Sequence, residues 1–248
     1  MKYVIISDLH SNLEALHGFL EALDSLKLST GFHFDKLVCL GDIAGYGANP
    51  NEVIAWVREH CHIVLGGNHD YAVVDKTDAS YFNQYAFDAC QWTSGVLTDE
   101  NRDYLKSLSA KEVRDEICWA HSSPFEPEEW HYIDNRYDGI DNFPHFKEKV
   151  CFVGHSHRPV IIEEREPNKV HEYYDSDWKL KAGHRYIFNV GSLGQPRDGN
   201  PDPAFAIFDS DENTYQVRRF QYDVKTAQSK IKAASLPAYL SDRLALGK

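Results

Sequence analysis

The sequence predicts an α/β fold in which two β-sheets pack face to face with helices outside them. In the first 70 residues, short apolar runs alternate with helix-like segments, a pattern typical of α/β proteins. From residue 149 onward, apolar runs follow one another closely, as hairpins in an antiparallel or mixed sheet do. A chain of 248 residues with 42% hydrophobic content can bury a large core, so we expect one domain over residues 1–248.

The N-terminal part reads as strand, helix, strand, helix, strand. The first strand is expected over residues 2–7 and the first helix over 11–26, where Ser11 and Glu14 suggest a capping box. A second strand (35–42) precedes a helix (48–60) with Asn49 as N-cap and Pro50 in the first turn. A third strand and its turn are expected over 62–70.

In the remaining two thirds of the chain, the predicted type of secondary structure changes twice. Residues 78–108 predict two or three helices and no strand, which we interpret as a helical insertion lying over or beside the main sheet. The expected later strands cover residues 112–123, 149–157, 158–164, 169–174, 184–192, 204–210 and 214–220. Residues 223–247 predict two helices that are interrupted near Pro237.

Charge and cysteine content limit the partners and the compartment. A formal net charge of −12 disfavours duplex nucleic acid, whose binding depends on Lys and Arg releasing counterions. No apolar run is long enough for a membrane span, and the N-terminal YVII is too short for a signal peptide. The five cysteines are scattered and mostly lie in apolar runs, which indicates free thiols in a reducing compartment, so we expect a cytoplasmic protein.

Metal-ligand residue types follow five of the expected strands. They come after YVIIS, LVCL, IVL, EICWA and CFV, and side chains at the carboxyl ends of strands converge on one crevice in open α/β sheets. A single D-x-H or H-x-H pair is commonly an ordinary loop pair, but five strand ends together favour a metal site. The candidate ligands are Asp8, His10, Asp42, Asn68, His121, His155 and His157.

The residue types also suggest the kind of metal. Imidazole and carboxylate together suit divalent transition metals such as Mn, Fe, Zn, Ni or Co. A carboxylate such as Asp42 can bridge two cations about 3.5–4 Å apart, the spacing of two-metal hydrolytic sites. A water between the two ions then becomes a hydroxide nucleophile near neutral pH, while the metals bind the phosphoryl oxygens.

The order D-x-H, G-D, G-N-H-D, H, G-H-S-H, from Asp8 to His157, resembles the calcineurin-like metallophosphoesterase superfamily. The stretches SDLHSNLEAL, GDIAGYGANPNEVI and NVGSLGQPRDG further resemble its YfcE-like branch of small bacterial and archaeal stand-alone phosphoesterases. The resemblance implies a four-layer αββα sandwich with two mixed β-sheets, and two divalent transition-metal ions as cofactors.

The resemblance also implies a role for each residue. One metal would be held by Asp8, His10 and His157, the other by Asn68, His121 and His155, with Asp42 between them. His69 would lie next to the leaving-group oxygen as general acid or transition-state donor, and Asp70 would orient it. The segment WAHSSP around His121 lacks the glycine that is common before this histidine in the family.

Three further residues are candidates for contact with substrate. The planar guanidinium of Arg197, in GSLGQPRDG, suits phosphate, although an arginine in such a loop is also commonly a surface residue. Asn12 and Tyr46 follow the first two ligand motifs and either touch substrate or cap a helix and pack a loop. The glycine-rich GDIAGYG lacks the pattern of a P-loop.

These observations predict a dinuclear-metal-dependent phosphoesterase that hydrolyses phosphodiester or phosphomonoester bonds by attack of a metal-bound hydroxide. A small nucleotide-type substrate is expected, and an oligomer is compatible with the sequence. A phosphoprotein phosphatase or a dinucleoside-polyphosphate hydrolase is an alternative, because both share the metal site within the superfamily. A non-catalytic scaffold should have lost a ligand or His69, whereas all of these residues are present.

Overall fold

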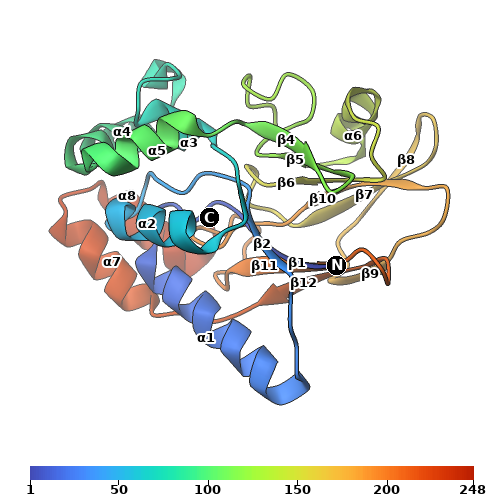
Figure 1. The fold of residues 1–248 in the computed structure, drawn as a ribbon. Helices are drawn as coiled ribbons and strands as arrows, with labels where there is room; N and C mark the ends of the chain where they lie inside the picture. Colours follow the sequence, from blue (N-terminus) through green and yellow to red (C-terminus); the bar gives the residue numbers. More distant parts are fainter.

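The computed structural model describes all 248 residues and consists of two mixed six-stranded sheets that pack face to face (Figure 1). In the first sheet the strand order is β3-β2-β1-β11-β12-β9. Strands β1, β2 and β3 run parallel, and the other three strands pair antiparallel. The strand bounds are β1 (Lys2–Ile6), β2 (Lys36–Cys39), β3 (Ile63–Val64), β9 (Asp177–Lys179), β11 (Ala204–Asp209) and β12 (Thr214–Arg219).

The second sheet has the order β4-β5-β6-β10-β7-β8. Its three middle strands β5, β6 and β10 run parallel, and the flanking strands pair antiparallel. The strand bounds are β4 (Lys111–Arg114), β5 (Ile117–Ala120), β6 (Val150–Val153), β7 (Val160–Glu166), β8 (Lys169–Tyr173) and β10 (Arg185–Asn189). The predicted fold class, with two mixed sheets between helices, is confirmed.

Side-chain alternation along the strands builds three layers of core. In β1, Tyr3 and Ile5 point into the space between the sheets, where they share a core with Phe152 of β6. Val4 and Ile6 point the other way and pack with the helices outside the first sheet. Because successive strand residues face opposite sides, each central strand is buried on both faces.

Helices cover the outer faces of both sheets. Helices α1 (Leu13–Thr30) and α2 (Pro50–His60) pack on the first sheet, and α6 (Arg136–Asn142) with η2 (Phe143–His145) covers the second. The chain ends in α7 (Val224–Ala233), α8 (Ala238–Asp242) and η3 (Arg243–Leu246). None of the helices combines the length and the apolar character that crossing a bilayer requires.

Residues 78–108 are helical and contain no strand, as expected. They form η1 (Ala79–Tyr81), α4 (Gln84–Val96) and α5 (Asp99–Ser107), which lie on the same side of the molecule as α2 and α8 (green in Figure 1). Ala86 and Ala89 of α4 share a core with Tyr46 and with Ile231 and Leu240 of the C-terminal helices. The segment therefore packs beside the loop that follows β2, and its interpretation as an insertion within a single domain stays a prediction.

Several local expectations were wrong. The capping box of Ser11 and Glu14 does not form, because α1 begins at Leu13 and Asn12 is its N-cap. Residues 112–123 are a hairpin rather than one strand, since Asp115 and Glu116 adopt the two left-handed conformations of a tight turn (φ 57° and 59°). In the segment 62–70, where a strand and its turn were expected, the strand ends at Val64 and the last three residues begin helix α3 (Asn68–Ala72). Strand β9 was not predicted.

Glu163 of β7 is a fully buried carboxylate on the second sheet, held by several donors. One oxygen accepts from the imidazole of His184 at 2.8 Å and from the hydroxyl of Tyr186 at 3.1 Å. The other accepts from the Arg165 guanidinium at 2.9 Å. Although burial opposes its charge, the hydrogen bonds from these three side chains lower the pKa of Glu163 to about 2, from 4.5.

We expect Glu163→Gln to lower the free energy of unfolding at pH 7 by about 2 kcal/mol, the typical contribution of a hydrogen bond to a charged group. Because the folded-state pKa is depressed, the stabilisation is complete above pH 4.5 and is lost as the pH falls toward 2. Urea unfolding of both proteins at pH 7 and near pH 3 measures this. An equal difference between wild type and variant at both pH values would contradict it.

Candidate metal centre

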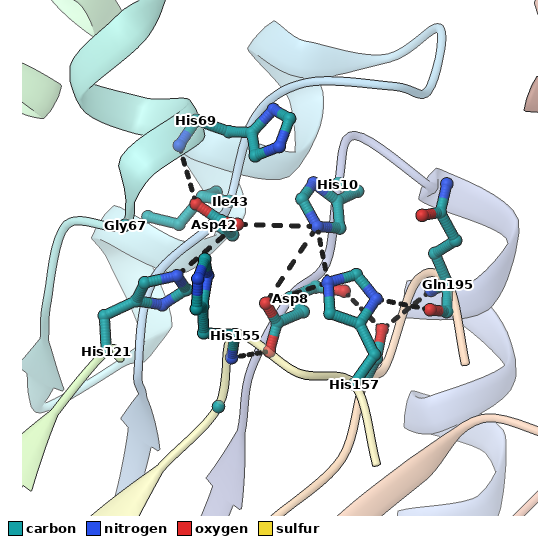
Figure 2. Close-up of polar contacts among 12 residues, drawn as sticks. Asp8, His10, Asp42, Ile43, Gly67, His69, His121, His155, His157 and Gln195 are labelled. Atoms are coloured by element: carbon teal, nitrogen blue, oxygen red, sulfur yellow. Dashed lines mark hydrogen bonds and ion pairs between the residues drawn. The ribbon is translucent and has the colours of Figure 1, made fainter. Parts of the chain in front are cut away.

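The predicted metal ligands meet at the carboxyl ends of strands from both sheets. Asp8 and Asp42 follow β1 and β2 of the first sheet, whereas His121 and His155 follow β5 and β6 of the second (Figure 2). The ligands therefore lie between the strand ends of two sheets, rather than in a crevice of one open sheet as expected. The side chains are buried, and their ligand atoms lie within 4.8 Å of one another in two sets.

The backbone bends sharply to aim these side chains inward. Five of the seven predicted ligands have left-handed backbones with φ between 48° and 64°, namely Asp8, His10, Asp42, His155 and His157. For a residue with a Cβ this conformation costs about 1–2 kcal/mol. Such conformations persist only where the surrounding structure enforces them, and they concentrate at functional sites.

The two sets share one carboxylate. The first set is Asp8, His10, Asp42 and His157, and the second is Asp42, His121 and His155. Oδ2 of Asp42 lies 3.6 Å from Nε2 of His10 and 3.4 Å from Nε2 of His121. This arrangement matches two cations with Asp42 between them.

Each of the four ligand histidines forms a hydrogen bond between one ring nitrogen and a backbone carbonyl. The other nitrogen is then the one without a proton when the ring is neutral, as in metal-ligating histidines whose second nitrogen is hydrogen-bonded. The pairs are His10 Nδ1 with Ala44 O (3.0 Å), His121 Nδ1 with Leu40 O (2.9 Å), His157 Nδ1 with Gln195 O (2.5 Å) and His155 Nε2 with Trp130 O (2.9 Å).

The effect of these hydrogen bonds on the other ring nitrogen is clearest between His10 and His157. Their Nε2 atoms are 3.1 Å apart, and each ring already uses Nδ1 on a carbonyl. Two nitrogen lone pairs at this distance repel each other unless a cation lies between them. The donor set itself therefore calls for a positive charge at this point.

Three buried polar atoms of the predicted ligands form no hydrogen bond. They are Oδ1 of Asp8, Oδ1 of Asn68 and Nε2 of His121. Buried polar atoms nearly always have a partner, so three unpartnered atoms among the predicted ligands favour a bound cation. Asn68 lies at the start of α3, and its place in the second set stays a prediction.

The charges of the centre are strongly coupled. Although burial opposes its protonation, the carboxylate of Asp42, with Asp8 and Asp70 further away, raises the pKa of His121 to about 9. Burial and the neighbouring His121 lower the pKa of His155 to about 3, and burial lowers that of His10 well below its usual value. The acidic pair Asp8 and Asp42 thus favours a bound cation, and a metal would take the place of the proton.

His69 lies beside the centre but in neither ligand set, as expected. Its ring packs against Tyr46 (centroids 4.4 Å apart), Phe82 (4.9 Å) and His10 (4.9 Å), and its backbone N–H donates to Oδ1 of Asp42 at 2.9 Å. Burial lowers the pKa of His69 to about 4, so the ring is neutral at pH 7. A neutral ring in this place can donate one N–H to a reacting oxygen.

The contact expected between Asp70 and the His69 ring does not form. The Asp70 carboxylate accepts instead from three backbone N–H groups, those of Ile43 (3.2 Å), Ala44 (2.9 Å) and Gly67 (3.0 Å). Asp70 therefore ties the loop after Asp42 to the start of α3. It positions the backbone that carries Asp42 and His69 rather than the imidazole itself.

The three candidates for contact with substrate differ in what the structure supports. The Asn12 side chain accepts from Ala15 N at 3.1 Å, which caps α1, and donates to Gly194 O at 2.8 Å. Both of its polar groups are therefore used within the protein, which favours the helix-capping alternative. Arg197 lies at the rim of the centre, with its guanidinium 5.6 Å from the Tyr46 ring centroid. Tyr46 itself is buried against His10 and packs the loop.

Sequence reasoning missed several contributors. The carbonyls of Trp130 and Gln195 orient ligand histidines, but a backbone group carries no residue-type signal. Gly154 does carry a residue-type signal, because it directly precedes the H-S-H motif. A Cβ at this position would lie 2.0 Å from Oγ of Ser7 and 2.6 Å from Oδ2 of Asp8. Glycine is required because the two sheets approach each other at this residue.

Comparisons with known proteins agree with this geometry. The calcineurin-like phosphoesterase superfamily domain matches residues 1–213. An uncharacterized protein of Methanocaldococcus jannaschii, MJ0912, is 38% identical over 98% of this chain and 97% of its own.

Two solved structures cover the whole chain. A metallophosphoesterase from Sphaerobacter thermophilus is 37% identical with a TM-score of 0.86, covering 100% of this chain and 99% of its own. The hypothetical protein PH1004 from Pyrococcus horikoshii shares the fold at 19% identity, with a TM-score of 0.82 and coverage of 100% and 98%. With the two ligand sets in place, these matches show that the chain belongs to the calcineurin-like phosphoesterase superfamily and is a metal-dependent phosphoesterase.

Proposed function

We propose that this phosphoesterase hydrolyses a phosphodiester or phosphomonoester bond of a small nucleotide-type substrate, using two divalent transition-metal ions with manganese among the candidates. One observation carries the proposal: two buried ligand sets share Asp42, and Asp8 and His121 in these sets each have a buried polar atom without a hydrogen bond. The mixture of imidazole and carboxylate favours a transition metal over Mg²⁺ or Ca²⁺.

The residues of this chain would divide the work as follows. Asp8, His10 and His157 would hold one ion, and Asn68, His121 and His155 the other, with Asp42 between them. Two such ions neutralise charge on phosphoryl oxygens and lower the pKa of a water bound between them.

His69 has a separate role in this proposal. Because its ring is neutral at pH 7 and lies in neither ligand set, it would donate an N–H to the leaving-group oxygen as negative charge develops there. Asp70 would keep the loop of Asp42 and the start of α3 in register through its three backbone contacts.

The test is hydrolysis by metal-stripped protein resupplied with Mn²⁺, Ni²⁺, Zn²⁺ or Mg²⁺. Bis(p-nitrophenyl) phosphate reports diester cleavage and p-nitrophenyl phosphate reports monoester cleavage, with metal content measured alongside. We expect turnover to require about two transition-metal ions per chain. Protein that binds no metal, or that turns over equally well without it, would overturn the proposal.

The same assay addresses the alternatives. Preference for a phosphopeptide over both chromogenic esters would favour a phosphoprotein phosphatase, and preference for a dinucleoside polyphosphate would favour that hydrolase class. Duplex nucleic acid is a poor candidate because of the net charge of −12. We also propose a reducing, cytoplasmic compartment, which the five free thiols support, four of them buried.

A further inference from the structure

Two arginines from distant parts of the chain lie against one tyrosine beside the metal centre. The guanidinium carbons of Arg197 and Arg243 are 5.6 Å and 5.9 Å from the centroid of the Tyr46 ring. That ring lies 4.6 Å from the ring of the ligand His10 and 4.4 Å from the ring of His69. A single aromatic ring thus separates both positive charges from the reaction centre.

Neither arginine has an Asp or Glu partner. The acidic residues next to them in sequence are engaged elsewhere: Asp198 pairs with Arg219, and Asp242 lies 3.7 Å from the ammonium of Lys232. In a chain with 38 acidic and 26 basic residues, two neighbouring arginines without an Asp or Glu partner are unexpected. Like charges held close together are unfavourable unless an anion joins them.

Most of their N–H groups are free. Arg197 uses Nε and Nη2 on the side-chain oxygen of Gln195 (3.3 Å and 2.9 Å), and Arg243 uses Nε on a main-chain oxygen of Lys248, the last residue of the sequence. A guanidinium carries five N–H donors, so Nη1 of Arg197 and both terminal nitrogens of Arg243 remain available. Burial and the charge of Arg197 lower the pKa of Arg243, yet a guanidinium stays charged at neutral pH.

The surrounding structure holds this pair in place. Arg243 also packs over Tyr239 of α8 (5.3 Å), and Tyr239 stacks on Tyr85 of α4 with centroids 4.7 Å apart. Tyr46 is buried in the core that the helical segment 78–108 shares with the C-terminal helices. The two guanidiniums are therefore positioned in advance of ligand binding, which reduces the entropy that binding would cost.

We propose that Arg197 and Arg243 form a second anion subsite, which binds a phosphoryl group of the substrate other than the one being cleaved. The substrate class is then an organic phosphate with at least two phosphoryl groups, such as a nucleoside diphosphate or triphosphate. This inference rests on the proposed function, because the scissile group must occupy the metal centre. A guanidinium pairs with phosphate through two parallel N–H···O bonds, and two of them match a doubly charged group.

The experiment compares two non-hydrolysable probes, methylenediphosphonate with two phosphonate groups and methylphosphonate with one. Calorimetric titration into manganese-loaded protein, cleared of free metal, gives both affinities for wild type, Arg197→Gln, Arg243→Gln and Arg243→Lys. Arg136→Gln is the control, because Arg136 is an exposed arginine on α6 whose guanidinium has no acidic partner. Metal content and thermal unfolding are measured for each protein.

We expect each glutamine variant to bind methylenediphosphonate about tenfold or more weakly, with methylphosphonate within about twofold of wild type. Arg243→Lys should show an intermediate loss, since it keeps the charge but not the planar fork. Equal losses for both probes would mean that the arginines contact the scissile group, and unchanged affinities would remove the subsite. The readout is binding, so a failure of the proposed hydrolysis would appear separately as intact binding without turnover.

Discussion

Replacing Asp42 by asparagine is expected to lower kcat/KM for phosphoester hydrolysis by about a thousandfold or more, several kcal/mol of transition-state stabilisation. Asp42 is the only residue common to both ligand sets, with Oδ2 3.6 Å from His10 and 3.4 Å from His121. An amide in its place removes one negative charge from both cation positions. The variant should stay folded, since an amide oxygen can still accept the 2.9 Å bond from the His69 backbone N–H.

Three measurements check this result: kcat/KM on both chromogenic esters, bound metal per chain, and thermal unfolding. Metal content should fall together with activity. Asp24→Asn is the matched control, because Asp24 is an exposed carboxylate on α1 paired only with Lys27. A folded Asp42→Asn protein that hydrolyses diesters as fast as wild type would show that the proposed centre is wrong.

His69→Ala is expected to lower kcat by about 10²- to 10⁴-fold, the range for loss of a positioned proton donor, while leaving metal content unchanged. The separation of the two effects follows from the structure. His69 is outside both ligand sets, and only its backbone N–H, which alanine retains, touches Asp42.

The dependence on leaving group makes this prediction specific. If His69 donates to the departing oxygen, an alkyl ester should lose more activity than a p-nitrophenyl ester, whose leaving group needs little help. His17→Ala, at an exposed position on α1, is the control. Equal losses on both esters, or loss of metal together with activity, would instead assign His69 a role in supporting the Asp42 loop.

Much of the fold was readable from the chain because local patterns and tertiary packing agree. Tyr3 and Ile5 alternate with Val4 and Ile6, and each pair faces its own core layer. Pro50 opens α2 at the first helical position as its fixed φ allows. Expectations failed where tertiary contacts decide. Strand β9 is three residues long and exists by pairing with β12, a contact no local pattern predicts.

The candidate site divides in the same way. The sequence by itself determined which residue types stand at the strand ends, because apolar runs that end in Asp, Asn or His are a local property of the chain. It indicated seven ligands, of which six form the two sets of carboxylates and imidazoles, and Asn68 has a buried side-chain oxygen without a hydrogen bond. It also set His69 apart from the ligands.

Only the tertiary structure decided how these groups act together. The two ligand sets meet because the carboxyl ends of strands from two separate sheets lie close together, and the partner of Asp70 is the backbone rather than His69. The approach of Arg243 to Arg197 spans 46 positions and depends on how the C-terminal helices pack on Tyr46. Such contacts form because whole helices and strands bury their apolar surfaces against one another. The free energy that stabilises them comes from the assembled core rather than from any one stretch of sequence.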